Sequence, residues 1–299
     1  MDAPPGKEDV RPYLEVGALL ESLGAHVPHV HESDVARGFV LLEDLGTRPY
    51  LQELEADADP DALYADALRV LADIQMRGGA AAKKLPPYDR EALARELALM
   101  PEWFCRRHLG FEPTASEEEV LGSAFEFLIS AALAQPQVFV HRDYHSRNLM
   151  VVGQRNPGVI DFQDALHGPI GYDLVSLLKD CYIAWPRARV AGWVAGYRSM
   201  LAARGVGLAS PRQFLRDFDL IGVQRHLKVL GIFARLWHRD GKPGYLLDLP
   251  RTLDYLREAC ALYPELAPLA EFLERRAVPE LSRANAQAIA LAKRVNSLM

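Results

Sequence analysis

His141-Arg142-Asp143-Tyr144-His145-Ser146-Arg147-Asn148, followed by Val159-Ile160-Asp161-Phe162, is the part of this sequence that decides its fold. Asp143 and Asn148 would lie in one tight loop, and Asp161 would follow a short apolar run and a turn. In phosphoryl transfer, one carboxylate accepts the proton of the attacking hydroxyl, while an amide oxygen and a second carboxylate hold magnesium. The spacing therefore predicts Asp143 as the base and Asn148 and Asp161 as ligands of Mg²⁺.

The residues on either side of this stretch predict β-strands that would hold it in place. Gln137–Val140 has the composition of a strand that enters the loop, and residues 149–152 form one that leaves it. Asn156-Pro157-Gly158 predicts the turn that leads into the second apolar run. The predicted order is strand, catalytic loop, hairpin and metal-binding aspartate. The alternative is that residues 141–143 form a salt-bridged surface turn and that Asp161-Phe162 is a strand end.

The composition of the chain excludes several classes of ligand. A length of 299 residues allows a large core, and two lobes are expected rather than one. The net charge is −6 with both signs interspersed, so we expect no binding to nucleic acid or to a membrane surface. Cys105, Cys181 and Cys260 are few, odd in number and far apart, which favours a reducing compartment. Because the sequence has neither a signal-peptide pattern nor a run of about 18 apolar residues, we expect a cytoplasmic protein.

Hydrophobic periodicity predicts a mixed segment followed by a mostly helical one. Apolar residues recur at helical spacing over residues 8–23, and residues 30–32 and 39–42 flank a polar segment, as in a β-hairpin. Further helices are predicted over residues 61–76, 89–100, 117–133, 172–183, 190–204, 211–239 and 253–299, with a loop over 77–88.

These elements predict the fold class and the domain organisation. We expect an α+β, protein-kinase-like fold with two lobes. An incomplete small N-terminal lobe would cover residues 1–48, and a mostly helical C-terminal lobe would cover residues 49–299. Glu43, Asp44 and Leu45 interrupt the strand pattern between the two lobes. In a two-lobed kinase this position is the hinge, where backbone groups pair with the adenine edge of the nucleotide.

The motifs resemble those of the aminoglycoside phosphotransferase and choline kinase superfamily. The resemblance rests on residues 141–150, on Ile160-Asp161-Phe162-Gln163-Asp164-Ala165 and on residues 168–174. Residues 156–159, Lys179-Asp180 with Trp185-Pro186, and residues 224–233 add a resemblance to the bacterial anomeric amino-sugar kinases within that superfamily. Together these segments extend the likeness over nearly the whole chain.

The resemblance implies a reaction and assigns roles to residues. It implies transfer of the γ-phosphoryl group of ATP, with Mg²⁺, to the C1 hydroxyl of N-acetylmuramate or N-acetylglucosamine, a step of peptidoglycan recycling. By motif match, Asp143 is again the base and Asn148 and Asp161 the magnesium ligands. No partner beyond ATP and a small amino sugar is implied.

Three further residues are expected to support the catalytic loop. By the same resemblance, Asp173 is a buried carboxylate that braces the loop, and His141 is a supporting member of it. His145 is expected to brace the loop rather than to bind metal, because magnesium prefers oxygen ligands. Ser146 stands where the superfamily usually has Pro, which changes the stiffness of the loop but removes no catalytic group.

One part of the superfamily pattern is not found near the start of the sequence. No Gly-rich phosphate loop, no G-x-x-x-x-G-K-[ST] motif and no strand-borne Lys precede the first predicted helix. Residues 1–5 resemble the end of the third strand of the small lobe. The expectation is therefore a longer open reading frame or a shortened version of the protein, in which Glu15 or Glu21 lacks its usual basic partner.

The sequence offers candidates for contacts to the acceptor. Tyr88-Asp89, Glu96 and Glu102-Trp103 could line its pocket, because carboxylates grip sugar hydroxyls and an aromatic ring covers the apolar sugar face. The alternative assigns these residues to helix caps and core packing.

A polar stripe on the helix predicted over residues 211–239 is a second candidate. It consists of Gln224, Lys228, Gly231, Arg235 and His238, which recur at helical spacing. Lys228 or Arg235 would pair with the lactyl carboxylate of muramate if the stripe faces the sugar. The alternative is a solvated helix face.

Two other functions compete with an amino-sugar kinase. The acceptor could be an aminoglycoside, choline or another alcohol, although a cationic acceptor would demand a markedly acidic pocket. Arg225, Lys228 and Arg235 instead favour a neutral or anionic sugar. The other alternative is a catalytically impaired, kinase-like binding protein, against which the complete set of Asp143, Asn148 and Asp161 argues.

Overall fold

The structure, a computed structural model, describes residues 1–4, 6 and 8–296. The chain forms two compact units, each built from two separate stretches of sequence. Unit 1 comprises residues 1–88 and 135–215, and unit 2 comprises residues 89–134 and 216–299. The predicted lobes, residues 1–48 and 49–299, are two continuous stretches and do not correspond to these units. The lobe boundary after residue 48 therefore stays a prediction.

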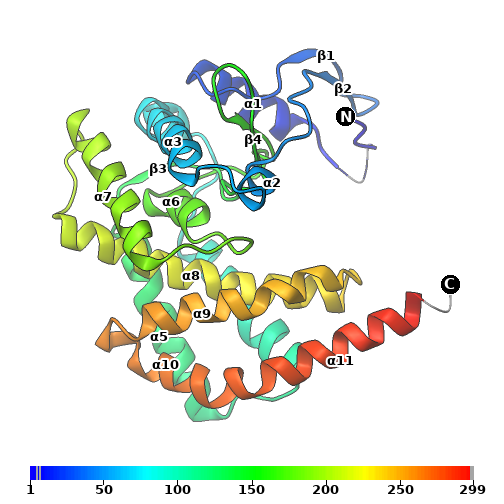
Figure 1. Cartoon of the computed structure of the whole chain (residues 1–299), viewed down its shortest axis with the longest axis vertical. Coiled ribbons are helices and arrows are strands. Elements are labelled where there is room, and N and C mark those ends of the chain that lie inside the picture. Colours follow the sequence, from blue (N-terminus) through cyan, green and yellow to red (C-terminus); the bar gives the residue numbers. More distant parts are fainter. Residues whose placement is uncertain (5, 7, 297–299) are drawn as a thin grey trace. The chain divides into compact units, whose positions relative to one another are not determined.

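Unit 1 contains all of the described strands and holds the predicted catalytic loop (Figure 1). Its strands are β1 (Val30–Asp34), β2 (Phe39–Leu42), β3 (Gln137–Val140), β4 (Leu149–Met150), β5 (Gly158–Val159) and β6 (Leu166–Pro169). Its helices are α1 (Arg11–Ser22), α2 (Tyr50–Glu55), α3 (Pro60–Ala82), α6 (Gly171–Leu178) and α7 (Arg187–Ala203). The strands pair into three two-stranded antiparallel sheets, β1 with β2, β3 with β6 and β4 with β5.

The β4–β5 hairpin sets the spacing between two of the predicted site residues. Leu149 pairs with Val159, and Met150 pairs with Gly158. Asn148 directly precedes β4, and Asp161 follows β5 by two residues. Because paired residues lie side by side in a ladder, this register brings residues 148 and 161 together although 13 positions separate them.

The hydrophobic core of unit 1 anchors the elements that carry the loop. α3 packs on β3, and Leu71, Ile74 and Phe139 are almost completely buried. α3 begins at Pro60 with Asp59 as its N-cap, whose side chain accepts a hydrogen bond from the backbone N–H of Asp61. Burial of this apolar face stabilises the helix and fixes the strand that leads into the loop.

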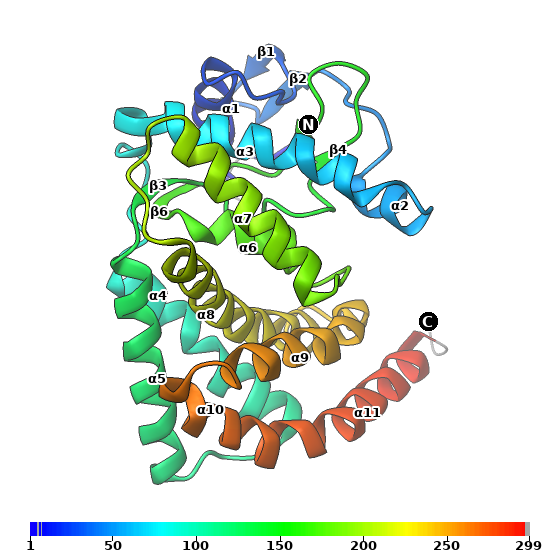
Figure 2. The same cartoon turned by 60° about the vertical axis from the view of Figure 1, so that its left-hand side comes forward.

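All the regular secondary structure in the described part of unit 2 is helical (Figure 2). Its elements are α4 (Arg90–Leu97), the π-helix η1 (Met100–Leu109), α5 (Ala115–Leu133), most of α8 (Pro211–His238), η2 (Pro243–Asp248), α9 (Leu249–Cys260), η3 (Pro264–Leu266), α10 (Ala267–Phe272), η4 (Leu273–Ala277) and α11 (Val278–Asn296). α5 starts with a complete capping box, in which Thr114 and Glu117 satisfy each other's backbone N–H groups.

The predicted hairpin over residues 30–42 and the helices over residues 8–23, 117–133, 190–204 and 211–239 are confirmed to within a few residues. The loop predicted over residues 77–88 is partly wrong, because α3 continues to Ala82 with a break at Gly79. α2 and β6 were not predicted. The helical tail predicted to residue 299 consists of several shorter helices, and its last three residues lie outside the described part.

The cysteines and the helices of the described part have the following properties. Cys105, Cys181 and Cys260 are all buried and form no disulfide bond. Burial raises the pKa of Cys105 and of Cys260 to about 12. None of the helices in the described part of the chain is long and apolar enough to span a bilayer.

Candidate active site

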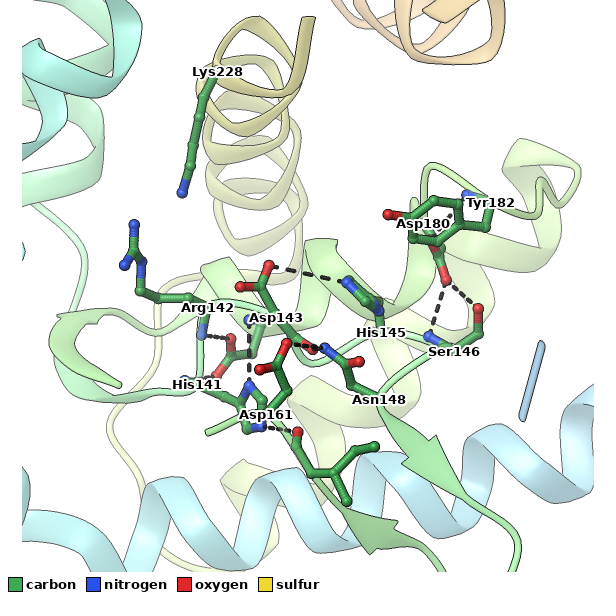
Figure 3. Close-up of polar contacts among 12 residues, drawn as sticks. His141, Arg142, Asp143, His145, Ser146, Asn148, Asp161, Asp180, Tyr182 and Lys228 are labelled. Carbon is green, nitrogen blue, oxygen red and sulfur yellow. Dashed lines mark hydrogen bonds and ion pairs between the residues drawn. The ribbon is translucent and has the colours of Figure 1, made fainter. Parts of the chain in front are cut away.

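The structure brings the three predicted catalytic residues together in unit 1. Nδ2 of Asn148 donates hydrogen bonds to the backbone oxygen of Asp143, over 3.0 Å, and to Oδ2 of Asp161, over 3.2 Å (Figure 3). Both donor hydrogens of the amide are thereby directed to protein oxygens. Oδ1 of Asn148 is the remaining polar atom of this side chain, and it is the atom that a hard cation would require.

Asp173 holds the start of the catalytic loop. Its carboxylate is completely buried and accepts hydrogen bonds from the backbone N–H groups of His141 (2.7 Å) and Arg142 (3.0 Å). Arg142 has a backbone φ of 76°, a region that a non-glycine residue adopts only when its surroundings hold it there. The two hydrogen bonds to Asp173 supply that constraint, as expected for a bracing carboxylate.

His141 links the catalytic loop to the segment after β5 that carries Asp161. Its ring is buried, and this burial lowers its pKa to about 4, so the imidazole is neutral at pH 7. Nδ1 accepts a hydrogen bond from the backbone N–H of Asp143 (3.3 Å), which leaves the proton on Nε2. Nε2 then donates to the backbone oxygen of Ile160 over 3.1 Å. The neutral ring therefore ties the loop to the backbone that precedes Asp161.

Asp161 is oriented by its sequence neighbours and by α1. Phe162 is buried, stacks on Tyr13 with ring centroids 4.7 Å apart, and approaches Gly17 so closely that a Cβ there would lie 3.2 Å from the ring. Asp161 itself has a φ of 65°, and Gln163 donates a hydrogen bond of 2.8 Å to its Oδ1. The packing of Phe162 on α1 fixes the backbone that presents the Asp161 carboxylate.

A cavity of about 600 Å³ opens beside these residues within unit 1. Asn148, Ile160, Asp161, Gln163 and Asp164 line it from the loop and hairpin side. Residues of the N-terminal segment and of α1, including Glu8, Asp9 and Tyr13, line the rest. A cavity of this size suits a small-molecule ligand.

His145 and the predicted hinge residues have defined contacts as well. Nε2 of His145 lies 4.0 Å from Oδ1 of Asp143, and its ring packs edge-on against Tyr182. The side chain of Glu43 accepts a hydrogen bond from the backbone N–H of His29, and this bond lowers the pKa of Glu43. The side chain of Asp44 accepts a hydrogen bond from the backbone N–H of Gly46. Leu45 forms no backbone–backbone hydrogen bond within the described part of the chain, and none of the three predicted hinge residues is among those that line the cavity beside Asn148 and Asp161.

The four predicted acceptor contacts lie in unit 2. Glu96 and Lys228 pair with each other, with Oε1 and Nζ 2.9 Å apart and both side chains largely buried. Asp89 is the N-cap of α4 and accepts from the backbone N–H of Ala92. Arg235 lies in the last turn of α8, and its Nε is buried without a hydrogen-bond partner among the described residues.

The solvated-face interpretation of the polar stripe on α8 is wrong for its first three residues, whereas Arg235 is half-buried and His238 is exposed. Gln224 and Lys228 are buried, and a Cβ at Gly231 would lie 2.4 Å from the carbonyl carbon of Leu99. Gly231 is therefore a site of close helix packing. Tyr88, another candidate for the acceptor pocket, is buried and packs against Tyr172 as a core residue.

Two residues with clear roles at the site were missed as contributors. Asp180 is buried and hydrogen-bonded to Ser146 in the catalytic loop, and Tyr144 donates from its hydroxyl to the backbone oxygen of Ala67 in α3. The Lys179-Asp180 pair at the end of an apolar helix was a usable signal, because a charge at such a position needs a partner.

Comparison with known proteins shows the family to which the chain belongs. The model of the phosphotransferase enzyme family, APH, matches residues 1–214, and the chain belongs to that family. It is 48% identical over 274 residues to the N-acetylmuramate/N-acetylglucosamine kinase of Pseudomonas putida, covering 91% of this chain and 80% of that protein. It is 46% identical over 275 residues to the enzyme of the same name from Neisseria meningitidis, covering 90% and 80%.

Solved structures confirm the protein-kinase-like α+β fold. The ADP-bound aminoglycoside phosphotransferase APH(2'')-Ib superposes with a TM-score of 0.54 at 17% identity, covering 84% of this chain and 83% of that one. Choline kinase LicA from Streptococcus pneumoniae superposes with a TM-score of 0.57 at 14% identity, covering 85% and 80%. At these identities the likeness concerns the fold.

Proposed function

We propose that this chain transfers the γ-phosphoryl group of ATP to the anomeric C1 hydroxyl of N-acetylmuramate, N-acetylglucosamine or both. The observation that carries the proposal is the identity of 46–48% to kinases named for these two sugars, over nine tenths of the chain. The grouping of Asp143, Asn148 and Asp161 supports a phosphotransferase over a binding protein that has lost catalysis. We place the reaction in the cytoplasm, in peptidoglycan recycling.

Asp143 is the base of the proposed reaction. Its side chain is about half exposed, so an acceptor hydroxyl can reach it, while its backbone oxygen is held by Asn148. The carboxylate accepts the proton of the C1 hydroxyl as the oxygen attacks the γ-phosphorus, and ADP leaves. Because the transition state of phosphoryl transfer is loose, most of the catalysis comes from holding the two reactants in line.

Asn148 and Asp161 are the residues that would hold Mg²⁺. The two side chains offer only oxygen to a cation once Nδ2 of Asn148 is directed to protein oxygens, and both line the cavity. When bound, the ion neutralises charge on the β- and γ-phosphates. In the predicted hinge, the N–H of Glu43 donates to the backbone oxygen of His29, so backbone groups of Asp44 and Leu45 would meet the adenine edge.

Replacement of the base tests the reaction. Asp143→Ala should lower sugar-dependent ATP consumption by at least about 100-fold, because general-base catalysis contributes about 10²–10⁴-fold. ATP binding, measured by calorimetry, should change little. Asp254→Ala, an exposed carboxylate in α9, is the matched control and should keep full activity. Undiminished turnover in Asp143→Ala would remove this residue from the mechanism.

Replacement of a metal ligand tests the metal site separately. Asp161→Asn keeps the size of the side chain and removes its charge, so Mg²⁺-dependent nucleotide binding should weaken by at least about tenfold. Titration of Mg²⁺ at fixed ATP measures this change. If the Mg²⁺ dependence were the same as in the unaltered protein, the assignment of Asp161 as a ligand would be wrong.

A panel of acceptors identifies the substrate. The chain is incubated with ATP, Mg²⁺ and N-acetylmuramate, N-acetylglucosamine, choline or kanamycin, and phosphorus NMR identifies the product. An anomeric phosphate doublet from the two amino sugars supports the proposal, whereas phosphorylation of choline or kanamycin contradicts it.

If Lys228 contacts the lactyl group, Lys228→Met should raise KM for N-acetylmuramate more than for N-acetylglucosamine. Glu96→Gln, which alters the other member of the pair, is its companion variant.

A further inference from the structure

A buried carboxylate outside the recognised motif grips the middle of the catalytic loop. Asp180 follows α6, and only 1% of its surface is exposed. Oδ2 of Asp180 accepts hydrogen bonds from both the backbone N–H (3.0 Å) and the hydroxyl of Ser146 (Figure 3). Oδ1 accepts from the backbone N–H of Tyr182 over 3.0 Å. One carboxylate thus joins the loop to the segment after α6.

The residues beside Ser146 are held by the same segment. The ring of Tyr182 lies under the guanidinium group of Arg147, 3.5 Å from the ring centroid, and against the ring of His145. The backbone oxygen of Ser146 accepts from the N–H of Leu51 in α2 over 2.9 Å. Three consecutive loop residues, 145–147, therefore have partners outside the loop.

The contacts of residues 145–147 matter for catalysis because of where these residues lie in the loop. Residues 145–147 lie between Asp143 and Asn148, so they set the relative position of the base and the metal ligand. Hydrogen bonds from N–H and O–H groups to a buried carboxylate are among the stronger ones in proteins, because one partner is charged. Small errors in the placement of reacting groups lower rates steeply, so a brace at this point affects catalysis more than binding.

We propose that Asp180 is a positioning residue, which acts through Ser146 to fix the distance between Asp143 and Asn148 during phosphoryl transfer. This inference rests on the proposed function. Asp180 touches neither substrate nor metal in this role. Asp173 holds the loop just before the base, and Asp180 holds it between the base and the metal ligand, so the two carboxylates anchor different parts of the loop.

Steady-state kinetics of Asp180→Asn test the proposal. The amide retains one acceptor oxygen, so either Ser146 or Tyr182 loses its carboxylate partner. We expect kcat to fall at least tenfold, with KM for ATP and for the sugar within twofold of the unaltered values. Ser146→Ala removes only the hydroxyl bond and should lower kcat two- to fivefold. Ser199→Ala, which removes an exposed hydroxyl from α7, is the matched control and should leave kcat unchanged.

A double-mutant cycle separates positioning from a general loss of stability. If Asp180 acts through Ser146, adding Ser146→Ala to Asp180→Ala should cause no further loss of kcat. Additive losses, a kcat of Asp180→Asn within threefold of the unaltered value, or a change confined to KM would each overturn the proposal. A loss that follows the unfolded fraction, measured by circular dichroism at the assay temperature, would also overturn it. If Asp180→Ala does not fold, Asp180→Asn and Ser146→Ala still decide the question.

Hydrogen exchange makes the result independent of the proposed reaction. The amide hydrogen of Ser146 should exchange at least tenfold faster in Asp180→Asn than in the unaltered protein, measured by mass spectrometry of a peptide covering residues 145–148. Unchanged exchange would overturn the brace itself. If the unaltered protein transfers no phosphoryl group to either sugar while the exchange result holds, the proposed function fails and the structural contact stands.

Discussion

Removal of the Asp173 carboxylate should destabilise unit 1 strongly. Asp173→Ala leaves the backbone N–H groups of His141 and Arg142 buried without their acceptor. A hydrogen bond to a charged group contributes about 1.5–3 kcal/mol, so the two together give a loss of about 3–6 kcal/mol. This is a large share of a typical unfolding free energy of about 5–15 kcal/mol. Asp173→Asn keeps one acceptor oxygen and should lose about half as much.

Urea unfolding followed by circular dichroism measures the free energy of unfolding of Asp173→Ala, and kinetics measures its activity. At about 2–4 °C per kcal/mol, the melting temperature should fall by about 6 °C or more. The control is again Asp254→Ala, whose exposed ion pair with Arg257 contributes about 0–1 kcal/mol. A loss below about 1 kcal/mol in Asp173→Ala would refute the reasoning, because the two N–H groups would then have found other acceptors.

Two further predictions concern helix packing and pH. Gly231→Ala should destabilise the protein by about 1–3 kcal/mol, because the new methyl group would meet the backbone of Leu99. Gly196→Ala in α7 should instead stabilise the protein by about 0.5–1 kcal/mol, because its new methyl group would meet no atom within 4 Å. Equal unfolding midpoints for these two variants would contradict the packing argument. The pKa of His141 is about 4 in the folded chain and about 6.5 in the unfolded one, so the unfolded chain binds the proton first as the pH falls. The stability is present above pH 6.5 and decreases between pH 6.5 and about 4 by up to about 3 kcal/mol, and His141→Asn should flatten the pH dependence of the unfolding midpoint in that window.

Short-range patterns allowed the catalytic loop and its hairpin to be predicted. Asp143, Asn148 and Asp161 lie within a stretch of 19 residues. The turn residues at 156–158 indicate the hairpin in which β4 pairs with β5. The roles assigned to these residues stay predictions, because geometry shows that they are close and not what they bind. The family and the fold follow from the comparisons as expected.

The contacts that escaped prediction join residues far apart in the sequence. Ser146 and Asp180 are separated by 34 positions, and no local pattern says that a carboxylate after α6 will face the loop. Glu96 and Lys228 bury each other's charges, so residues that look solvated by type lie inside unit 2. β6 contains Gly168 and Pro169, which have low β propensity, and it forms a strand because it pairs with β3.

The left-handed backbone at Asp161 has an evolutionary consequence. Asn and Gly tolerate a φ of 65° better than other residue types do, and each is one base change away from an aspartate codon. Either substitution would remove the carboxylate while preserving the local conformation. With the metal-ligand role proposed for Asp161, a single base change would therefore remove the proposed chemistry while the local backbone conformation is preserved.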